Sequence, residues 1–300
     1  MTSSSHDIVT FDATEHRLRF QPPLAMGQLM RFLGDRAIPG VESFDGTTFA
    51  RAVRTPVGRP AVLALTSSPG RNEVTLRIAS DGPGDPSELV LIARRLFDLD
   101  AHPAAIDDVL SADPALGPLV RATPGIRLPG AADGFELAVR AILGQQVSVR
   151  AARTFAGRIA ESMGTPLERP FDGVTHLFPT AERLSASSLG SLGLTKARAA
   201  TLRTVAELVA AGELDLSGTT DPEGTVERLL AVPGIGPWTV AYVSMRALRD
   251  PDAFPVGDLG VRLGFEALGL PSSPAAMRSH AERWRPWRAY AVMHLWNAAH

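Results

Sequence analysis

The chain has 300 residues, 45% of them hydrophobic, which is enough to bury a sizeable core in one large domain or two ordinary ones. It contains no cysteine, which excludes a disulfide framework, a cysteine-ligated zinc ion or iron–sulfur cluster, and a thiol nucleophile. The formal net charge of −2 argues against a nonspecific polyanion coat, although the arginines near the end of the chain leave room for a local basic face.

The N-terminal segment carries no basic stretch followed by an apolar run, as a secretory signal would. No segment reaches the roughly 18 consecutive apolar residues of a membrane span. We therefore expect a cytoplasmic protein without membrane contact.

Short apolar stretches broken by turn residues predict strands in the N-terminal part of the chain, at residues 18–20, 49–53, 61–65 and 74–78. A helix is expected after Pro22–Pro23, with Leu29, Met30, Phe32 and Leu33 on its apolar side, and a second helix through residues 89–97. This pattern predicts an α+β domain over residues 1–112. The acidic segment 98–114 leads out of it, and we place the boundary near residue 113.

Beyond that boundary strand signals nearly vanish and helical periods follow one another. The expected helices cover residues 133–145, 148–163, 196–211, 225–231, 237–248, 259–267, 274–284 and 287–298. The predicted fold class is thus α+β, with an N-terminal α/β domain followed by an all-helical region over residues 113–300. His294 has the spacing of a structural residue inside this helical core.

Two short helices, at about 225–248, flank the turn Pro233-Gly234-Ile235-Gly236. Glycine lets the backbone turn sharply and approach a partner closely, and Pro237 sits where a helix tolerates proline. The free N–H groups at the start of the second helix suit a DNA phosphate, a contact that carries no sequence information. A bare glycine turn is also common in ordinary helical pairs, so the motif gains weight only from its context.

Asp258 follows the second of these helices, after a Pro255-Val256-Gly257 loop. Taken alone it is typical of an N-cap, because a helical pattern begins directly behind it. Beside the hairpin, the same carboxylate becomes a candidate catalytic group.

The segment Leu-Leu-Ala-Val-Pro-Gly-Ile-Gly-Pro-Trp-Thr (229–239), followed by Asp-Ala-Phe-Pro-Val-Gly-Asp (252–258), resembles the helix-hairpin-helix DNA glycosylase superfamily, and within it the 3-methyladenine DNA glycosylase II family. Further stretches support the resemblance over nearly the whole chain, at residues 20–23, 127–130, 141–149, 177–180 and 282–296. The resemblance implies an N-terminal domain like half of a TATA-binding-protein fold, and helical domains that enclose a cleft.

The resemblance also implies the site residues. Asp258 would be the catalytic carboxylate; the base pocket would comprise Trp238, Tyr242, Trp296 and Phe32; and the phosphate-binding hairpin would comprise Gly234, Ile235, Gly236 and Thr239. Trp238 and Tyr242 lie four residues apart and therefore share one helix face. The alternative role for both side chains is packing in the hydrophobic core. Phe32 could equally be an ordinary residue of the hydrophobic core.

Hydrolysis of an N-glycosidic bond builds positive charge on the sugar, which a nearby carboxylate stabilises. Alkylated purines such as 3-methyladenine and 7-methylguanine are cationic and leave readily, and electron-rich aromatic faces attract them. Bifunctional members of the superfamily place a lysine where this chain has Trp238, and Lys196 is the only lysine here. We therefore expect a monofunctional enzyme without a strand-cleaving lyase step.

Base flipping requires a residue that fills the gap in the duplex. Gln146 is the candidate wedge, where the family's best-known form has leucine. The family's hairpin also binds an alkali ion through backbone carbonyls, which here would be those of Leu230, Val232 and Ile235. No other cofactor is expected, although Na⁺ or K⁺ at the hairpin is implied.

Two other functions remain open at this stage. A noncatalytic DNA-binding module would keep the hairpin but is expected to lose Asp258 or the aromatic pair, and a glycosylase for another lesion, such as oxidised guanine, commonly has the lysine or cluster cysteines absent here. The expected partner is double-stranded DNA with damaged bases, bound by a monomer. The sequence does not rank 3-methyladenine, 7-methylguanine, hypoxanthine and ethenoadenine as substrates.

Overall fold

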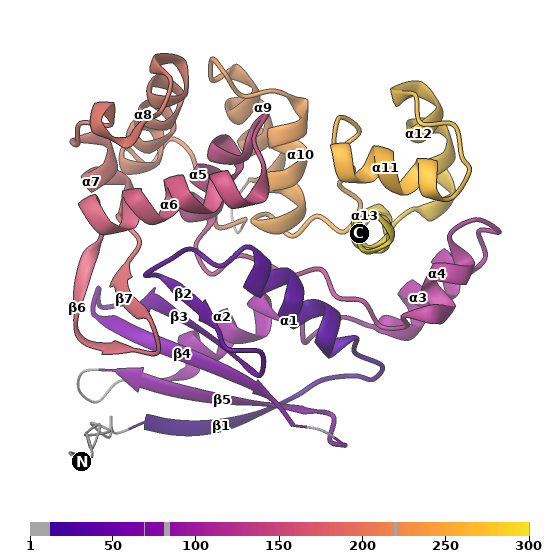
Figure 1. The fold of residues 1–300 in the computed structure, drawn as a ribbon, viewed down its shortest axis with the longest axis horizontal. Helices are drawn as coiled ribbons and strands as arrows, with labels where there is room; N and C mark the ends of the chain where they lie inside the picture. Colours follow the sequence, from indigo (N-terminus) through magenta and orange to yellow (C-terminus); the bar gives the residue numbers. More distant parts are fainter. Residues whose placement is uncertain (1–12, 69, 81–84, 219–220, 300) are drawn as a thin grey trace, which may run out of the picture.

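A five-stranded antiparallel sheet forms the lower layer of the molecule in the computed structural model, which describes residues 13–68, 70–80, 85–218 and 221–299 (Figure 1). The strand order is β1-β5-β4-β3-β2. The strands are β1 (Ala13–Arg19), β2 (Glu42–Phe44), β3 (Thr48–Arg54), β4 (Pro60–Ser67) and β5 (Glu73–Ser80). Each predicted strand is confirmed. Strand β2 was not predicted, because three residues are too few to show an alternating pattern.

The two faces of this sheet bury side chains of different size. Large residues such as Phe49, Leu63 and Leu76 point to the face that α1 (Met26–Asp35) and α2 (Ser87–Leu96) cover. The opposite face presents small residues, among them Ala50 and Ala64. The alternation follows from the period of two along a strand.

A β-hairpin from the helical region covers the small-residue face, so the expectation of an all-helical second part was wrong in this detail. Its strands are β6 (Thr165–Phe171) and β7 (Val174–Leu177). The Gly40 carbonyl accepts from the N–H groups of Thr175 at 2.7 Å and His176 at 2.9 Å. Only Leu167 of β6 is buried, so β6 shows no apolar alternation in the sequence. Tertiary contact with the sheet, rather than local pattern, stabilises this hairpin.

The remaining regular elements of the described chain are helices, and most of the predicted ones are confirmed within a few residues. They are α3 (Pro103–Ser111), α4 (Gly117–Ala122), α5 (Gly134–Gly144), α6 (Val149–Met163), α7 (Ala181–Ser185), α8 (Lys196–Ala210), α9 (Pro222–Ala231), α10 (Pro237–Arg246), α11 (Leu259–Ala267), α12 (Pro274–Ala281) and α13 (Arg288–Ala298), with 3₁₀ turns at Gly190–Leu192 and Glu282–Trp284. Helices α3, α4 and α7 were not predicted. The boundary near residue 113 stays a prediction; that residue lies between α3 and α4.

The helices belong to two hydrophobic cores. One joins the sheet and α1 to α3, α4, α11 and α13, so the end of the chain packs against its beginning. The other lies among α5, α6, α8, α9 and α10. His294 is 2% exposed, on a helix of the first core, as its spacing predicted. Tyr242 packs against both cores, which places α10 at their junction.

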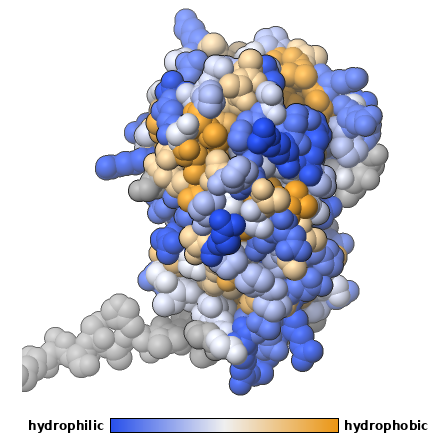
Figure 2. Space-filling view, turned by 90° about the vertical axis from the view of Figure 1, so that its right-hand side faces the viewer, coloured by the Kyte–Doolittle hydropathy of each residue, from blue (hydrophilic) through white to orange (hydrophobic). Residues whose placement is uncertain are grey.

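Within the described ranges, no helix has both the length and the apolar character that crossing a bilayer requires. The face that carries α11 and α12 is mixed, with apolar patches among hydrophilic side chains (Figure 2). Leu259 and Leu263 on α11 are exposed at 59% and 39%. They lie one helical turn apart directly after Asp258, so apolar surface adjoins the candidate catalytic residue.

Candidate active site

Asp258 is the N-cap of α11 and accepts hydrogen bonds from three N–H groups. Its Oδ1 accepts from the Val261 backbone N–H at 2.9 Å and from the Trp296 indole Nε1–H at 2.7 Å, while Oδ2 accepts from the Trp238 Nε1–H at 2.8 Å. The predicted N-cap is present. The same carboxylate is thereby fixed between tryptophans of α10 and α13, so capping and a chemical role are compatible.

Four aromatic rings gather around this carboxylate. Trp238 and Tyr242 stack with ring centroids 5.6 Å apart, and Tyr242 meets Trp296 at 6.2 Å. Phe32 of α1 stacks on Trp296 at 5.9 Å with an interplanar angle of 11°. Phe32 and Trp296 are buried, whereas Trp238 and Tyr242 are half-buried. The structure thus brings together all four predicted pocket residues from three helices distant in sequence.

Two arginines that the sequence reasoning missed lie on these rings. The Arg36 Cζ is 4.0 Å from the Phe32 ring centroid and 5.9 Å from that of Trp296. The Arg246 Cζ is 5.0 Å from the Phe32 centroid and 5.9 Å from that of Tyr242. Guanidinium groups therefore occupy aromatic faces that were expected to attract a cationic base.

Helical spacing contains the signal for both arginines. Arg36 follows Phe32 by one helical turn, and Arg246 follows Tyr242 in the same way. Trp238, Tyr242 and Arg246 therefore form one stripe along α10. Neither arginine forms an ion pair with a carboxylate among the described residues, and the spacing gives no indication of this.

A buried charge cluster supports the Arg36 end of the site. Arg51 of β3 donates to Glu42 at 2.8 Å and to Glu136 at 2.7 Å, and Arg140 of α5 pairs with the same two glutamates. Arg140 also donates to the Arg36 backbone carbonyl at 2.5 Å. Burial raises the pKa of Glu42, but the two arginines outweigh it and hold that pKa below its ordinary value. The cluster joins the sheet to α5 and fixes the end of α1.

The predicted hairpin connects α9 to α10. Gly234 has φ +89°, a conformation that favours glycine, and a Cβ there would lie 2.2 Å from Thr201 Oγ1. Gly236 is the N-cap of α10, followed by Pro237, and a Cβ at Gly236 would meet no atom within 4 Å. Gly234 is exposed, whereas Ile235 is buried at 8%. The open helix end at Gly236 can accept a phosphate on its backbone N–H groups.

Thr239 and Gln145 connect the hairpin to the turn between α5 and α6. Thr239 is 2% exposed, and its Oγ1 accepts from Gln145 Nε2 at 2.9 Å. The same amide donates to the Gly234 carbonyl at 3.0 Å. Gln146, the predicted wedge, is exposed with φ +56°. A buried Thr239 side chain leaves its backbone N–H as the group available to a phosphate.

The implied alkali ion would bind at the carbonyl end of α9. Leu230 lies in the last turn of α9, where carbonyls lack intrahelical partners, and the Val232 carbonyl accepts from the Ile235 N–H at 3.0 Å. Partial negative charge at a helix C-terminus suits a cation. The carbonyl chemistry of Leu230, Val232 and Ile235 therefore fits such an ion, which remains a proposal.

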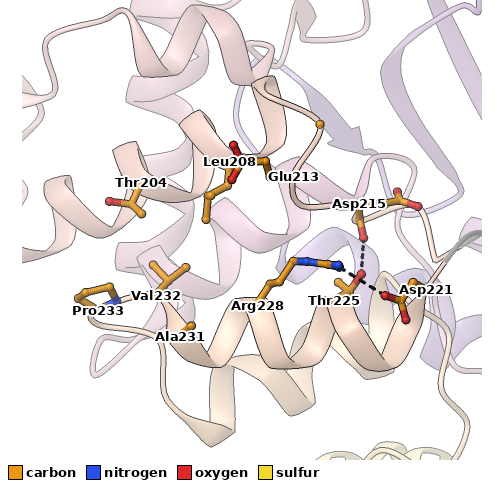
Figure 3. Close-up of a pocket in the computed structure, with 11 residues that line it drawn as sticks. Thr204, Leu208, Glu213, Asp215, Asp221, Thr225, Arg228, Ala231, Val232 and Pro233 are labelled. Atoms are coloured by element: carbon orange, nitrogen blue, oxygen red, sulfur yellow. Dashed lines mark hydrogen bonds and ion pairs between the residues drawn. The ribbon is translucent and has the colours of Figure 1, made fainter.

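A separate cavity of about 680 Å³ is lined by α8, α9 and the loop between them, and it extends to Val232 and Pro233 at the start of the hairpin turn (Figure 3). Its polar lining includes Glu213, Asp215 and Asp221, and Arg228 pairs with Asp221 at 3.5 Å. Predominantly acidic side chains repel phosphate. This cavity is therefore distinct from the aromatic site and unsuited to a nucleic-acid backbone.

Comparison with known families accounts for the hairpin and the sheet together. Residues 15–133 match the AlkA N-terminal domain, and residues 139–289 match the HhH-GPD superfamily base excision DNA repair protein family. The chain belongs to the HhH-GPD superfamily. The first match contains β2 to β5 with α1 to α4, and the second contains α6 to α12, the hairpin between α9 and α10 among them.

Individual proteins are similar to this chain over most of its length. A protein of Mycobacterium tuberculosis, named probable bifunctional transcriptional activator/DNA repair enzyme AlkA, is 41% identical over 93% of this chain, which spans only 56% of that relative's length. DNA-3-methyladenine glycosylase 2 of Escherichia coli is 36% identical over 94% of this chain and 96% of its own. The structure of 3-methyladenine DNA-glycosylase from Archaeoglobus fulgidus covers 95% of this chain and 98% of its own with a TM-score of 0.79; at 23% identity it shows a shared fold.

Proposed function

We propose that this protein is a monofunctional DNA glycosylase that flips an alkylated base from duplex DNA and hydrolyses its N-glycosidic bond. The observation that carries the proposal is the Asp258 carboxylate, held by the indole N–H groups of Trp238 and Trp296 beside a stack of aromatic rings. The names of the similar proteins in E. coli and A. fulgidus point to the same activity and to alkylated bases.

The geometry supports a dissociative hydrolysis. As the bond between the base nitrogen and C1′ lengthens, the sugar acquires positive charge, and the Asp258 carboxylate stabilises it. The base departs with the bonding electron pair, water then adds to C1′, and the proton that this water loses passes to solvent. Because Asp258 is anchored by three N–H donors, little reorganisation is needed when the charge develops.

Binding tasks are distributed among neighbouring elements. The turn at Gly234–Gly236 offers backbone N–H groups to a DNA phosphate, Gln146 is exposed as the wedge, and Trp238 and Tyr242 receive the extruded base. A Schiff-base lyase step requires an amine, and Lys196 lies instead at the exposed start of α8. Activity as a monomer belongs to the same proposal.

The test is single-turnover release of free base from methylated duplex DNA by the wild type and Asp258→Asn, with and without alkali. We expect wild type to free 3-methyladenine and to leave the strands intact until alkali is added. The Asn variant should bind DNA but lose at least about a hundredfold in rate, because the charge is gone and only one acceptor oxygen remains.

Each part of the proposal can fail separately. DNA binding without base release by the wild type would favour a noncatalytic module, and strand breakage without alkali would overturn the monofunctional assignment. Circular dichroism of both proteins serves as the folding control, since Asn retains an N-cap oxygen for α11.

A further inference from the structure

Arg246 is a buried cation whose hydrogen-bond acceptors are all neutral. The residue is 5% exposed at the end of α10. Its Nε donates to the Pro129 carbonyl, its Nη2 to the Gly130 carbonyl at 3.2 Å, and its Nη1 to the Tyr242 hydroxyl at 3.1 Å. Within the part of the chain that the structure describes, Arg246 forms no ion pair.

This arrangement contrasts with the other buried arginines nearby. Arg51 and Arg140 share two glutamates, so their cluster carries no net charge. Arg246 has no carboxylate bonded to it, and Arg36 beside it adds a second positive charge to the pocket. Negative charge reaches these two arginines only through space, from Glu42 in the case of Arg246 and from Asp35 and Asp258 in the case of Arg36. Burial of an unpaired cation is costly. Burial lowers the pKa of Arg246 to about 10, so the group stays charged at neutral pH.

The charges stand at opposite ends of the α10 stripe. Trp238 bonds to Asp258, Tyr242 bonds to Arg246, and the two rings stack on each other. A base against these rings has the carboxylate toward one end and the guanidinium toward the other. Bond cleavage moves an electron pair from the sugar to the base, so this polarity matches the charge shift.

We propose that Arg246 is a specificity-determining residue: its charge, which has no ion-pair partner among the described residues, stabilises the electrons taken by the departing base and so extends the pocket from cationic to neutral purine lesions. The proposal rests on the proposed glycosylase function. A cationic base, such as 7-methylguanine, departs neutral. A neutral base, such as hypoxanthine, departs as an anion and takes up a proton from water.

Coulomb's law separates the two lesion classes. A cationic base is repelled by Arg246 in the bound ground state, whereas the neutral departing base is not. Removal of Arg246 should therefore tighten binding of the cationic lesion and slow base release from the bound complex by similar factors. For a neutral base, Arg246 leaves binding unaffected and stabilises only the transition state. The ratio of the single-turnover rate to the half-saturating enzyme concentration therefore depends on Arg246 only for the neutral lesion.

The experiment compares wild type with Arg246→Met, which keeps an apolar stem without the charge, on matched duplexes that contain one hypoxanthine or one 7-methylguanine. Single-turnover rate and half-saturating enzyme concentration are measured for each duplex. For hypoxanthine we expect the ratio of rate to half-saturating concentration to fall about thirtyfold or more, with half-saturation nearly unchanged. For 7-methylguanine we expect that ratio to change by less than about threefold, with a lower half-saturating concentration.

Two further variants keep the result interpretable. Arg246→Lys retains the charge and should retain the wild-type preference between the lesions. Arg246→Gln is neutral but keeps a donor for the Pro129 carbonyl, and it replaces the Met variant if that variant unfolds. Each of these variants can also weaken the hydrogen bond to Tyr242. That effect is the same for both lesions, so it cancels when the loss on hypoxanthine is divided by the loss on 7-methylguanine.

Equal losses on both lesions would overturn the proposal and leave Arg246 with a structural role. A wild type that releases 7-methylguanine but not hypoxanthine would overturn it as well, with the glycosylase function intact. Failure of the wild type on both bases would instead contradict the proposed function itself.

Discussion

Asp258 combines an architectural and a chemical task in one carboxylate. Its Oδ1 caps α11 through the Val261 N–H and also accepts from Trp296, while Oδ2 accepts from Trp238. Gly260 makes room for this arrangement, because a Cβ there would lie 2.7 Å from the Trp296 ring. The cap holds the carboxylate at the beginning of a helix, and the indoles fix its direction. A rigid charge of this kind is what preorganised electrostatic catalysis requires.

Gln145 is the residue through which the wedge turn contacts the hairpin. Gln145→Leu removes its hydrogen bonds to the Gly234 carbonyl and Thr239 Oγ1 at similar volume. We expect single-turnover base release to fall about tenfold, because the loss of these two hydrogen bonds loosens the turn that carries Gln146. Thermal unfolding is measured in parallel.

The neighbouring glutamine provides the matched control. Gln146→Leu changes an exposed side chain and should leave the unfolding free energy within about 0.5 kcal/mol of wild type. If Gln145→Leu released base as fast as wild type, Gln145 would have no positioning role.

At the scale of elements, the hairpin combines two glycines with different requirements. Gly234 needs its positive φ and its contact with Thr201, whereas Gly236 has an ordinary φ of −107° and open space around it. The first glycine is therefore required by the fold, and the second is free to serve the approach of a ligand.

Alanine substitution separates these requirements. Gly234→Ala should lower the unfolding free energy by about 1–3 kcal/mol, because the positive φ and the Thr201 hydroxyl both oppose a Cβ. Gly236→Ala should leave stability nearly unchanged but weaken binding to duplex DNA about tenfold, since the methyl group stands at the open helix end. Chemical denaturation and fluorescence anisotropy measure the two effects. Unaltered DNA affinity of a folded Gly236→Ala variant would place the phosphate elsewhere.

For the whole molecule, the buried charge cluster joins the sheet to α5. Arg51→Met leaves Glu42 and Glu136 without one shared partner, and we expect the unfolding free energy to fall by about 3–5 kcal/mol. Arg19→Met is the matched control: Arg19 is 88% exposed and pairs with Glu73 at 3.6 Å, so its loss should cost less than about 1 kcal/mol. Urea unfolding measures both variants, and similar losses would show that the buried cluster contributes no more than a surface pair.

Asp98 makes stability depend on pH across the junction of α2 and α13. It accepts from the Leu128 N–H at 3.0 Å and from the Tyr290 hydroxyl at 2.9 Å, and burial raises its pKa from 3.8 to about 6. A raised carboxyl pKa means that the folded state binds more protons, so this contribution to stability falls as pH rises from about 4 to 6. Buried His294 acts in the opposite sense. Burial lowers its pKa from 6.5 to about 4, so its contribution to stability is lost as pH falls from about 6.5 to 4.

Asp98→Asn removes one of these opposing contributions. Asn tolerates the φ of +51° and keeps one oxygen for the hydrogen bonds. The unfolding free energy of the variant relative to wild type should therefore rise by about 2–3 kcal/mol between pH 4 and pH 7. Denaturant unfolding at a series of pH values measures this difference, and parallel curves for the two proteins would contradict the assignment.

Local pattern determined most elements and several roles. Apolar periodicity located α1, α5, α6 and the main strands, while glycine and proline spacing indicated the hairpin. Absence of lysine at position 238 already favoured a monofunctional reaction. Each of these features depends on residues within one or two turns of each other, and such neighbours are visible in the sequence.

Only the tertiary structure decided which distant groups meet. Hairpin β6–β7 depends on the sheet that it covers, so its own residues carry little strand signal. The closure of α13 onto α1 brings Trp296 beside Phe32. Arg51 and Arg140 pair with two glutamates, whereas Arg246 donates only to neutral oxygens among the described residues. Long-range packing determines the dielectric surroundings and the partners of a charge, and these cannot be inferred from the spacing of residues along the chain.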